Sequence, residues 1–249
     1  SGQGAGNSPG KWAMISSTLF DAYEQDAQGA YFQSPDGRTN TKVHMIGFVD
    51  DTSSSINDFM AEKPHHPDTY IALATKDAQR WNDLLRLSGG ALEDTKCSYH
   101  FLYYDFTISG LPILRDVDTS SRISIYFNGS NERIPLTQKS AYSSHKTLGT
   151  HKTPSGSTLA AQRAMQEKNK HHAKMLARHP FDKIDAWAYY HSIYLPSITY
   201  PLPSGYLPSS QLIKLQSQVK QALLPKYGFS RSTPNAVVYG PTDLAGIAI

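Results

Sequence analysis

Met45-Ile46-Gly47-Phe48-Val49-Asp50-Asp51-Thr52 is an apolar run that ends in two adjacent carboxylates and then changes to small hydroxyl residues. Residues 43–49 are rich in β-branched and aromatic side chains, which predicts a buried strand. A return strand would place Asp50 and Asp51 at the tip of a tight β-hairpin. Neighbouring acids repel each other and lose solvation, so a metal ion is one reason to keep both. The alternative is an ordinary acidic turn, because Asp is common in turns.

The composition limits the class of protein in which this stretch lies. The 249 residues suffice for one large or two small domains, and 39% hydrophobic with 18% charged residues is typical of a soluble globular protein. No run approaches the roughly 20 apolar residues of a membrane helix, so we expect no membrane partner. The single cysteine, Cys97, favours a reducing, intracellular compartment without distinguishing nucleus from cytoplasm. The sequence starts at Ser1 inside an apparent motif, and we therefore expect a fragment.

Charge is distributed unevenly along the chain. Residues 1–138 hold 11 Lys and Arg against 17 Asp and Glu, a balance of −6. Residues 139–231 hold 13 against 3, a balance of +10, and the last 18 residues contribute −1. A block this basic favours a polyanionic partner. The alternative is a solvated helical surface without a partner.

Patterns along the chain predict an α+β fold. A glycine-rich loop, residues 1–10, precedes a helix whose apolar stripe includes Leu19 and Tyr23, and a second helix over residues 68–87 has Asp68 as its expected cap. Further strands are predicted within residues 98–106, 123–127 and 144–149, and helices within 157–178, from 182 onward, and 209–223. We expect a small antiparallel sheet packed on helices, then a mainly helical basic region, with a boundary near residue 153.

Four short motifs follow one another along the chain. Gly2-Gln3-Gly4-Ala5-Gly6-Asn7-Ser8-Pro9 resembles the pattern (P)QGxxxSP, and Phe48-Val49-Asp50-Asp51 resembles YxDD with Phe in place of Tyr. Ser88-Gly89-Gly90-Ala91-Leu92 followed by Lys96 is similar to a later motif of small residues and a lysine. His145-Lys146-Thr147-Leu148-Gly149-Thr150 is similar to a strand called the primer grip. The order of these motifs resembles the later part of a reverse transcriptase of the kind encoded by eukaryotic retroelements.

This resemblance implies a polymerase fold. Residues 1–153 would be a partial palm, containing the nucleotide-pocket loop, the catalytic hairpin and the primer-grip strand. Residues 154–249 would be a basic, thumb-like helical region. The family's first catalytic aspartate and its fingers lie upstream of the motif with which this sequence begins. We therefore expect the chain to be unable to polymerise by itself.

The resemblance also implies a chemistry, in which a primer 3′-hydroxyl attacks the α-phosphate of a nucleotide and two Mg²⁺ ions, or Mn²⁺ in their place, stabilise the reacting oxygens. Asp50 and Asp51 would be catalytic and hold the metal, and Lys96 would assist the departing pyrophosphate. Nucleotide or primer contacts would come from Gln3, Gly4, Ser8, Pro9, Phe48, Val49, Leu148 and Gly149. The duplex phosphates would be held by Lys168, Lys170, Lys174 and Arg178.

The expected partners are therefore an RNA template, a DNA primer and deoxynucleoside triphosphates, while the sequence names no protein partner. Two other hypotheses stay open. One is a polymerase-like module that binds RNA as a scaffold and has lost catalysis, against which the paired acids Asp50 and Asp51 argue. The other is a globular domain in which the motifs are coincidental.

Overall fold

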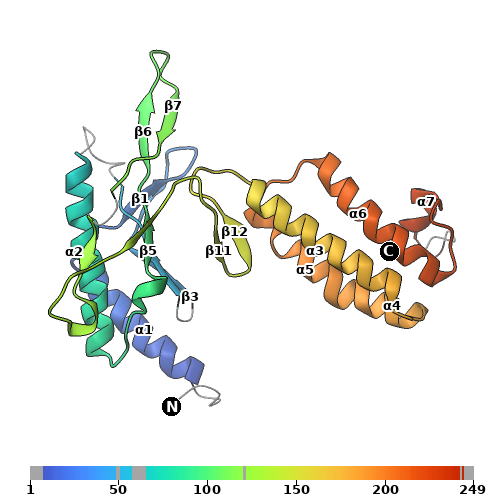
Figure 1. The fold of residues 1–249 in the computed structure, drawn as a ribbon, viewed down its shortest axis with the longest axis horizontal. Helices are drawn as coiled ribbons and strands as arrows, with labels where there is room; N and C mark the ends of the chain where they lie inside the picture. Colours follow the sequence, from blue (N-terminus) through green and yellow to red (C-terminus); the bar gives the residue numbers. More distant parts are fainter. Residues whose placement is uncertain (1–7, 49–50, 58–65, 120–121, 242, 244–249) are drawn as a thin grey trace. The chain divides into compact units, whose positions relative to one another are not determined.

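The computed structural model describes residues 8–48, 51–57, 66–119, 122–241 and 243 (Figure 1). The chain forms two compact units. The first comprises the described residues of 1–103 and 115–140, and the second those of 104–114 and 141–249. The expected α+β class is confirmed, with several two-stranded sheets in place of one small sheet and a helical C-terminal region. The functional boundary near residue 153 stays a prediction.

The first unit combines two long helices with short strands. Its elements are α1 (Ser8–Glu24), β1 (Ala30–Gln33), β2 (Asn40–Val43), β3 (Met45–Phe48), β4 (Asp51–Ser54), α2 (Pro67–Leu87), η1 (Asp94–Lys96), β5 (Ser98–His100), β8 (Ser124–Ile125), η2 (Phe127–Gly129), β9 (Ile134–Pro135) and β10 (Thr137–Lys139). Strands β1 with β2, β3 with β4, and β8 with β9 pair antiparallel, whereas β5 and β10 pair in parallel. The strand expected over residues 98–106 is divided into two. Its first part, β5, pairs with β10, which lies far along the chain, and its second part is a separate strand over Tyr103–Phe106.

The core of the first unit lies where α1 packs on α2. Tyr23, from the predicted apolar stripe of α1, is 1% exposed and meets Trp81 of α2 edge to face at 5.7 Å. Phe20 stacks on the same indole at 5.6 Å with an interplanar angle of 11°. Leu85 and Met45 complete the cluster, and Met45 brings strand β3 onto it. Burial of this aromatic group stabilises the contact between the two helices.

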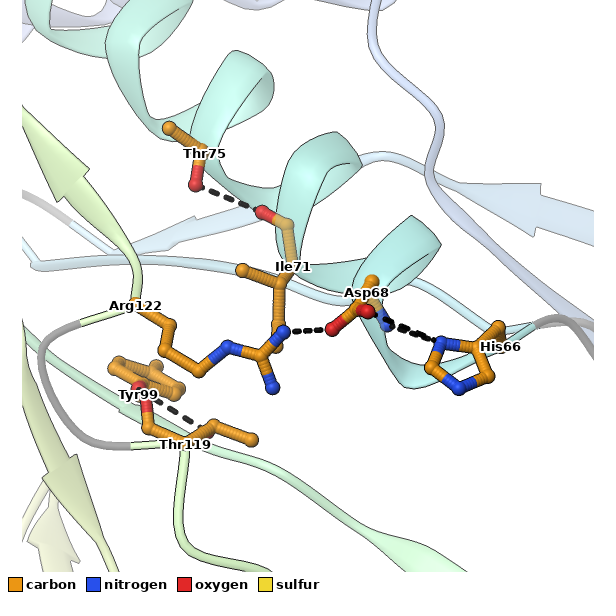
Figure 2. A network of polar contacts seen from close by, with 7 residues as sticks. All are labelled: His66, Asp68, Ile71, Thr75, Tyr99, Thr119 and Arg122. Atoms are coloured by element: carbon orange, nitrogen blue, oxygen red, sulfur yellow. Dashed lines mark hydrogen bonds and ion pairs between the residues drawn. The ribbon is translucent and has the colours of Figure 1, made fainter.

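The N-terminus of α2 differs from the prediction. Asp68 is not the cap, because His66 occupies the cap position and its Nδ1 accepts a hydrogen bond from the Asp68 backbone N–H at 3.4 Å. Pro67 explains the shift, since the residue before a proline is held extended and proline suits the first helical position. The Asp68 carboxylate instead pairs with Arg122, whose side chain reaches toward it from beside Tyr99 and Thr119 (Figure 2). The Tyr99 hydroxyl donates to the carbonyl oxygen of buried Thr119 at 2.6 Å.

The second unit is dominated by helices. Its elements are β6 (Tyr103–Phe106), β7 (Pro112–Arg115), β11 (His145–Thr147), β12 (Thr150–Lys152), α3 (Leu159–Arg178), α4 (Lys183–Tyr189), η3 (Tyr190–Tyr194), α5 (Leu195–Thr199), η4 (Leu202–Ser204), α6 (Ser209–Leu223), η5 (Leu224–Tyr227) and α7 (Asn235–Val238). Helices α3 and α6 lie side by side (Figure 1), and Leu176, Leu215 and Leu223 are buried in the shared core. Asp182, the residue at which a helix was predicted to start, caps α4 and accepts from the Asp185 backbone N–H at 2.8 Å.

Pro196 does not interrupt the helical run that begins at α4. The run continues through η3, a single π-helical turn, into α5. Proline has no N–H to donate to the preceding turn, and a π-turn accommodates that missing hydrogen bond. Within the described residues, no helix combines the length and apolarity needed to cross a bilayer.

Candidate functional site

The predicted acidic hairpin is present. Strand β3 pairs antiparallel with β4, and Phe48 is the partner of Asp51, which leaves two residues in the connection. Those two residues, Val49 and Asp50, lie outside the described part of the chain, as do Gln3 and Gly4. Asp51 is exposed as the first residue of β4. The predicted hairpin is therefore confirmed, with Asp51 as the first residue of its second strand, and a site role for the acidic pair stays a prediction.

Gly47 fixes how closely the hairpin approaches α1. A Cβ atom at this position would lie 3.1 Å from Cε2 of Phe20 and closer still to Cζ of the same ring. Glycine is the residue that permits such an approach. Because Phe20 is itself stacked on Trp81, the base of β3 rests on an aromatic ring that has little freedom to move.

The other strand of the hairpin also meets α1, because the side chain of Ser54 interacts with the hydroxyl of Tyr23. Burial, with a further contribution from the charge of Asp77, raises the pKa of Tyr23 to about 12, while the interaction with Ser54 lowers it. Tyr23 therefore stays neutral near neutral pH. Both strands of the hairpin therefore contact α1, with the closer approach at Gly47 of β3.

The remaining residues predicted for the first unit lie in separate elements. Ser8 and Pro9 form the first turn of α1, and Lys96 is an exposed residue at the end of η1. Among the described residues, no group of three His, Cys, Asp or Glu side chains is arranged to hold a metal ion. Asp51 is one acidic ligand, and the predicted second, Asp50, is outside the described residues. A complete metal site is therefore not assembled from the described side chains.

Leu148 and Gly149 form the two-residue connection between β11 and β12 in the second unit. Their φ angles are +51° and +78°, and positive φ at both positions is what a type I′ hairpin turn requires. Gly149 adopts this conformation without strain, but a branched aliphatic residue such as Leu148 does so at a cost of about 1–2 kcal/mol. Leu148 is 38% exposed, so part of its surface is accessible at the tip of this hairpin.

Three of the four predicted phosphate-binding residues share one face of α3. Lys170, Lys174 and Arg178 follow a spacing of four residues and are all exposed. Side chains four apart lie above one another on a helix, so the three form a continuous basic stripe. Lys168 is exposed on a different part of the helix surface, and its charge acts on His172. The structure therefore brings together three residues of the predicted set and separates the fourth.

Helix α6 adds a lysine that the sequence reasoning missed. Lys214 lines a pocket of about 210 Å³ between α3 and α6 together with Lys170, Gln166, Gln211 and Gln218. The buried amide of Asn169 holds the two helices together, because its Nδ2 donates to Gln218 Oε1 at 2.8 Å and its Oδ1 accepts from Tyr194 at 3.0 Å. The sequence could have indicated this lysine, because Gln211, Lys214 and Gln218 recur at helical spacing. They form a polar stripe beside the buried apolar residues of α6.

Comparison of the chain with protein-family models, with curated proteins and with solved structures found no match.

Proposed function

We propose that the chain is part of an RNA-directed DNA polymerase, a nucleotidyltransferase that extends a primer 3′-hydroxyl along a template. The observation that carries the proposal is the two-residue hairpin that presents Asp51 beside Phe48, seated on α1 through Gly47. The contact between Gly47 and Phe20 fixes the hairpin on α1, and a carboxylate on a fixed hairpin is held in place more firmly than one on an ordinary acidic loop. The order of the four motifs over residues 2–150 supports the same assignment.

In this proposal the hairpin is the metal-binding element. Asp51 and Asp50 would supply hard oxygen ligands, which suit Mg²⁺ or Mn²⁺. When bound, the metal ions would neutralise charge on the reacting phosphate. Phe48 and Val49 would lie near the primer end, Ser8 and Pro9 near the nucleotide, and Lys96 near the leaving pyrophosphate. These roles follow from the motif resemblance.

The strained turn at Leu148 supports a primer contact by β11 and β12. Residues held in a backbone conformation that they disfavour are concentrated at functional sites. An apolar side chain at the tip of a hairpin can pack against a sugar or base without forming an ionic contact. Leu148 and Gly149 would thus touch the primer while the α3 stripe holds the duplex phosphates.

The metal-binding half of the proposal is tested by titrating the chain with Mn²⁺ and following its backbone amide NMR signals. We expect paramagnetic broadening centred on β3 and β4, and loss of this broadening in Asp51→Asn. Asp21→Asn, at an exposed position on α1, is the matched control and should behave like the unmodified chain. Uniform broadening, or broadening that Asp51→Asn leaves intact, would argue for an acidic turn without a metal site.

The nucleic-acid half is tested by fluorescence anisotropy with an RNA–DNA hybrid at several salt concentrations. Each phosphate contact should contribute a slope of about −0.9 to log affinity against log salt. Replacing Lys170 and Lys174 with Ala should weaken binding similarly for all sequences and flatten the slope by up to roughly two units. Lys42→Ala with Lys183→Ala removes two exposed lysines that belong to β2 and α4 and is the control. If both pairs of substitutions weakened binding equally, the proposal that the α3 stripe binds the duplex would be refuted.

The second candidate, an RNA-binding scaffold without catalysis, is favoured by one observation, namely that the α3–α6 basic face is complete among the described residues while the metal site is not. The two experiments separate the candidates. A scaffold predicts salt-dependent binding of the hybrid without selective Mn²⁺ broadening at β3 and β4. A polymerase predicts both results.

A further inference from the structure

The first unit has a pocket of about 590 Å³ that none of the predicted polymerase residues lines. One wall is the outer face of α2, and the other is the segment that carries β8 and β9. The side chains that matter for its chemistry are Lys76, Gln79, Arg80, Asp83, Tyr126 and Arg133. A volume of this size accommodates a ligand of nucleotide dimensions.

The pocket has more positive than negative charge available to a ligand. Lys76 is exposed on α2 and forms no ion pair with a described residue. Arg80 has its Nη2 2.9 Å from Asp26 Oδ2 and donates from the same nitrogen to the Ala22 carbonyl oxygen, so Asp26 is neutralised. The Nε of Arg80 is buried without a hydrogen-bond partner among the described residues. The Arg80–Asp26 pair adds no net charge, so an anion in the pocket would form its charge-assisted contact with Lys76.

Tyr126 and Arg133 line the pocket as a cation–π pair. The Arg133 guanidinium lies 5.0 Å from the centre of the Tyr126 ring. The backbone of Tyr126 is fixed on both sides, because its N–H donates to Gln79 Oε1 at 2.7 Å and its carbonyl oxygen accepts from buried Asn82 at 2.9 Å. Nucleobases stack on aromatic rings and on guanidinium planes of this kind.

Asp83 supplies a carboxylate oxygen that suits a hydroxyl donor. Its Oδ1 accepts from Gln79 at 2.9 Å and from Asn82 at 3.2 Å. Both bonds end on the same oxygen, so Oδ2 accepts no hydrogen bond from the described residues. Carboxylates in nucleotide-binding proteins accept hydrogen bonds from ribose hydroxyls. The same carboxylate would repel an acidic peptide, and a simple anion would make no use of it.

We propose that this pocket binds one ribonucleotide unit of RNA, with the base on Tyr126 and Arg133, the ribose hydroxyls on Asp83, and the phosphate beside Lys76 and Arg80. The site would be additional to the hairpin and to the α3–α6 face. It would hold single-stranded RNA, because a paired base is not free to stack on the Tyr126 surface. The proposal does not depend on the polymerase assignment.

The test is NMR titration of the intact chain with AMP, 2′,3′-dideoxyAMP and inorganic phosphate. We expect AMP to shift amide signals of Gln79, Asp83 and Tyr126 with a Kd of about 1 mM or tighter. DideoxyAMP should bind about tenfold more weakly, because the hydrogen bond to a charged acceptor is lost. Phosphate should be the weakest of the three. Equal affinity for AMP and phosphate would refute a nucleotide site.

Variants locate the site and exclude effects of misfolding. Lys76→Ala combined with Arg133→Ala should weaken AMP binding about tenfold or more, and Asp83→Asn should remove most of the preference for AMP over dideoxyAMP. Lys42→Ala is the matched control, because Lys42 lies 5.3 Å over Tyr31 in a similar cation–π pair away from the pocket. All variants are checked by circular dichroism, and their exposed positions make loss of folding unexpected. AMP binding that survives the double substitution would overturn the proposal.

Discussion

Substituting Gly47 with alanine tests whether the acidic hairpin is positioned by direct contact with α1. The added methyl group would meet the Phe20 ring at less than van der Waals distance. Phe20 has little room to withdraw, because its ring is stacked on Trp81 within the core of the first unit. Either the ring leaves its stack or the strand moves away from α1, and both responses cost packing energy.

We expect Gly47→Ala to destabilise the first unit by about 1–3 kcal/mol, the range for overpacking of a filled core. That corresponds to an increase of roughly five- to 150-fold in the unfolding equilibrium constant. Urea unfolding is followed by tryptophan fluorescence in a Trp187→Phe background. This background removes the tryptophan of the second unit, so the signal reports on Trp12 and Trp81.

The matched control is Gly10→Ala, where no atom lies within 4 Å of the added Cβ and the backbone is helical. That change should stabilise the unit by about 0.5–1 kcal/mol, because alanine is the better helix former. Phe20→Leu replaces the ring by a smaller side chain and should restore part of the stability lost in Gly47→Ala. A double-mutant cycle measures this coupling between the two positions. A Gly47→Ala protein as stable as the unmodified chain would show that the hairpin does not rest on Phe20.

Three other substitutions test features of the fold. Leu148→Asn should raise stability by about 0.5–1 kcal/mol in thermal unfolding, because asparagine tolerates positive φ better than leucine, and unchanged or lower stability would contradict the strained turn. Asn82→Ala should lower the free energy of unfolding in urea by about 2–4 kcal/mol, because the backbone N–H of Asn128 and the carbonyl of Tyr126 lose a buried partner. A loss below about 1 kcal/mol would refute this role. Ile108→Ser should leave the melting temperature unchanged, since this side chain is fully exposed, and a clear decrease would show that the hairpin of β6 and β7 is covered.

Local patterns in the sequence predicted the helices well. Helix α6 begins and ends where its leucine and valine spacing indicated, and the cap of α4 at Asp182 follows from a short acceptor placed just before an apolar stripe. The hairpin of β3 and β4 was also predictable, because the change from apolar to acidic residues marks its turn. The cap of α2 was missed, because Asp68 is a better cap than His66 by residue type but Pro67 fixes the register.

Long-range contacts were outside what the sequence indicated. The parallel pairing of β5 with β10 joins segments almost 40 residues apart, and no local periodicity encodes it. The same holds for the pocket beside α2, where Arg133 and Tyr126 meet a helix face that precedes them by about 50 residues. Among the predicted site residues, Lys168 was grouped with its neighbours by charge, whereas the helical period places it on another face.

His172 makes the stability of the second unit depend on pH. Its Nδ1 lies 2.7 Å from the Tyr189 hydroxyl, and its Nε2 lies 3.1 Å from Ser197 Oγ. Ser197 donates its proton to the Tyr194 carbonyl oxygen at 2.8 Å, so Nε2 carries the histidine proton and Nδ1 accepts from Tyr189. Protonation of Nδ1 would make it a donor, so Tyr189 could no longer donate its hydroxyl proton to His172.

Burial, and then the charges of His171 and Lys168, hold the pKa of His172 below its usual value of 6.5. The folded state therefore binds this proton less readily than the unfolded state. The stability that depends on neutral His172 is complete above about pH 6.5 and is lost as the pH falls from there through the lower pKa of the folded state. Thermal unfolding at several values between about pH 5 and 8 should show a smaller decrease for His172→Gln than for the unmodified chain. His179→Gln, at an exposed histidine, is the control, and the same decrease in all three proteins would refute the role of His172.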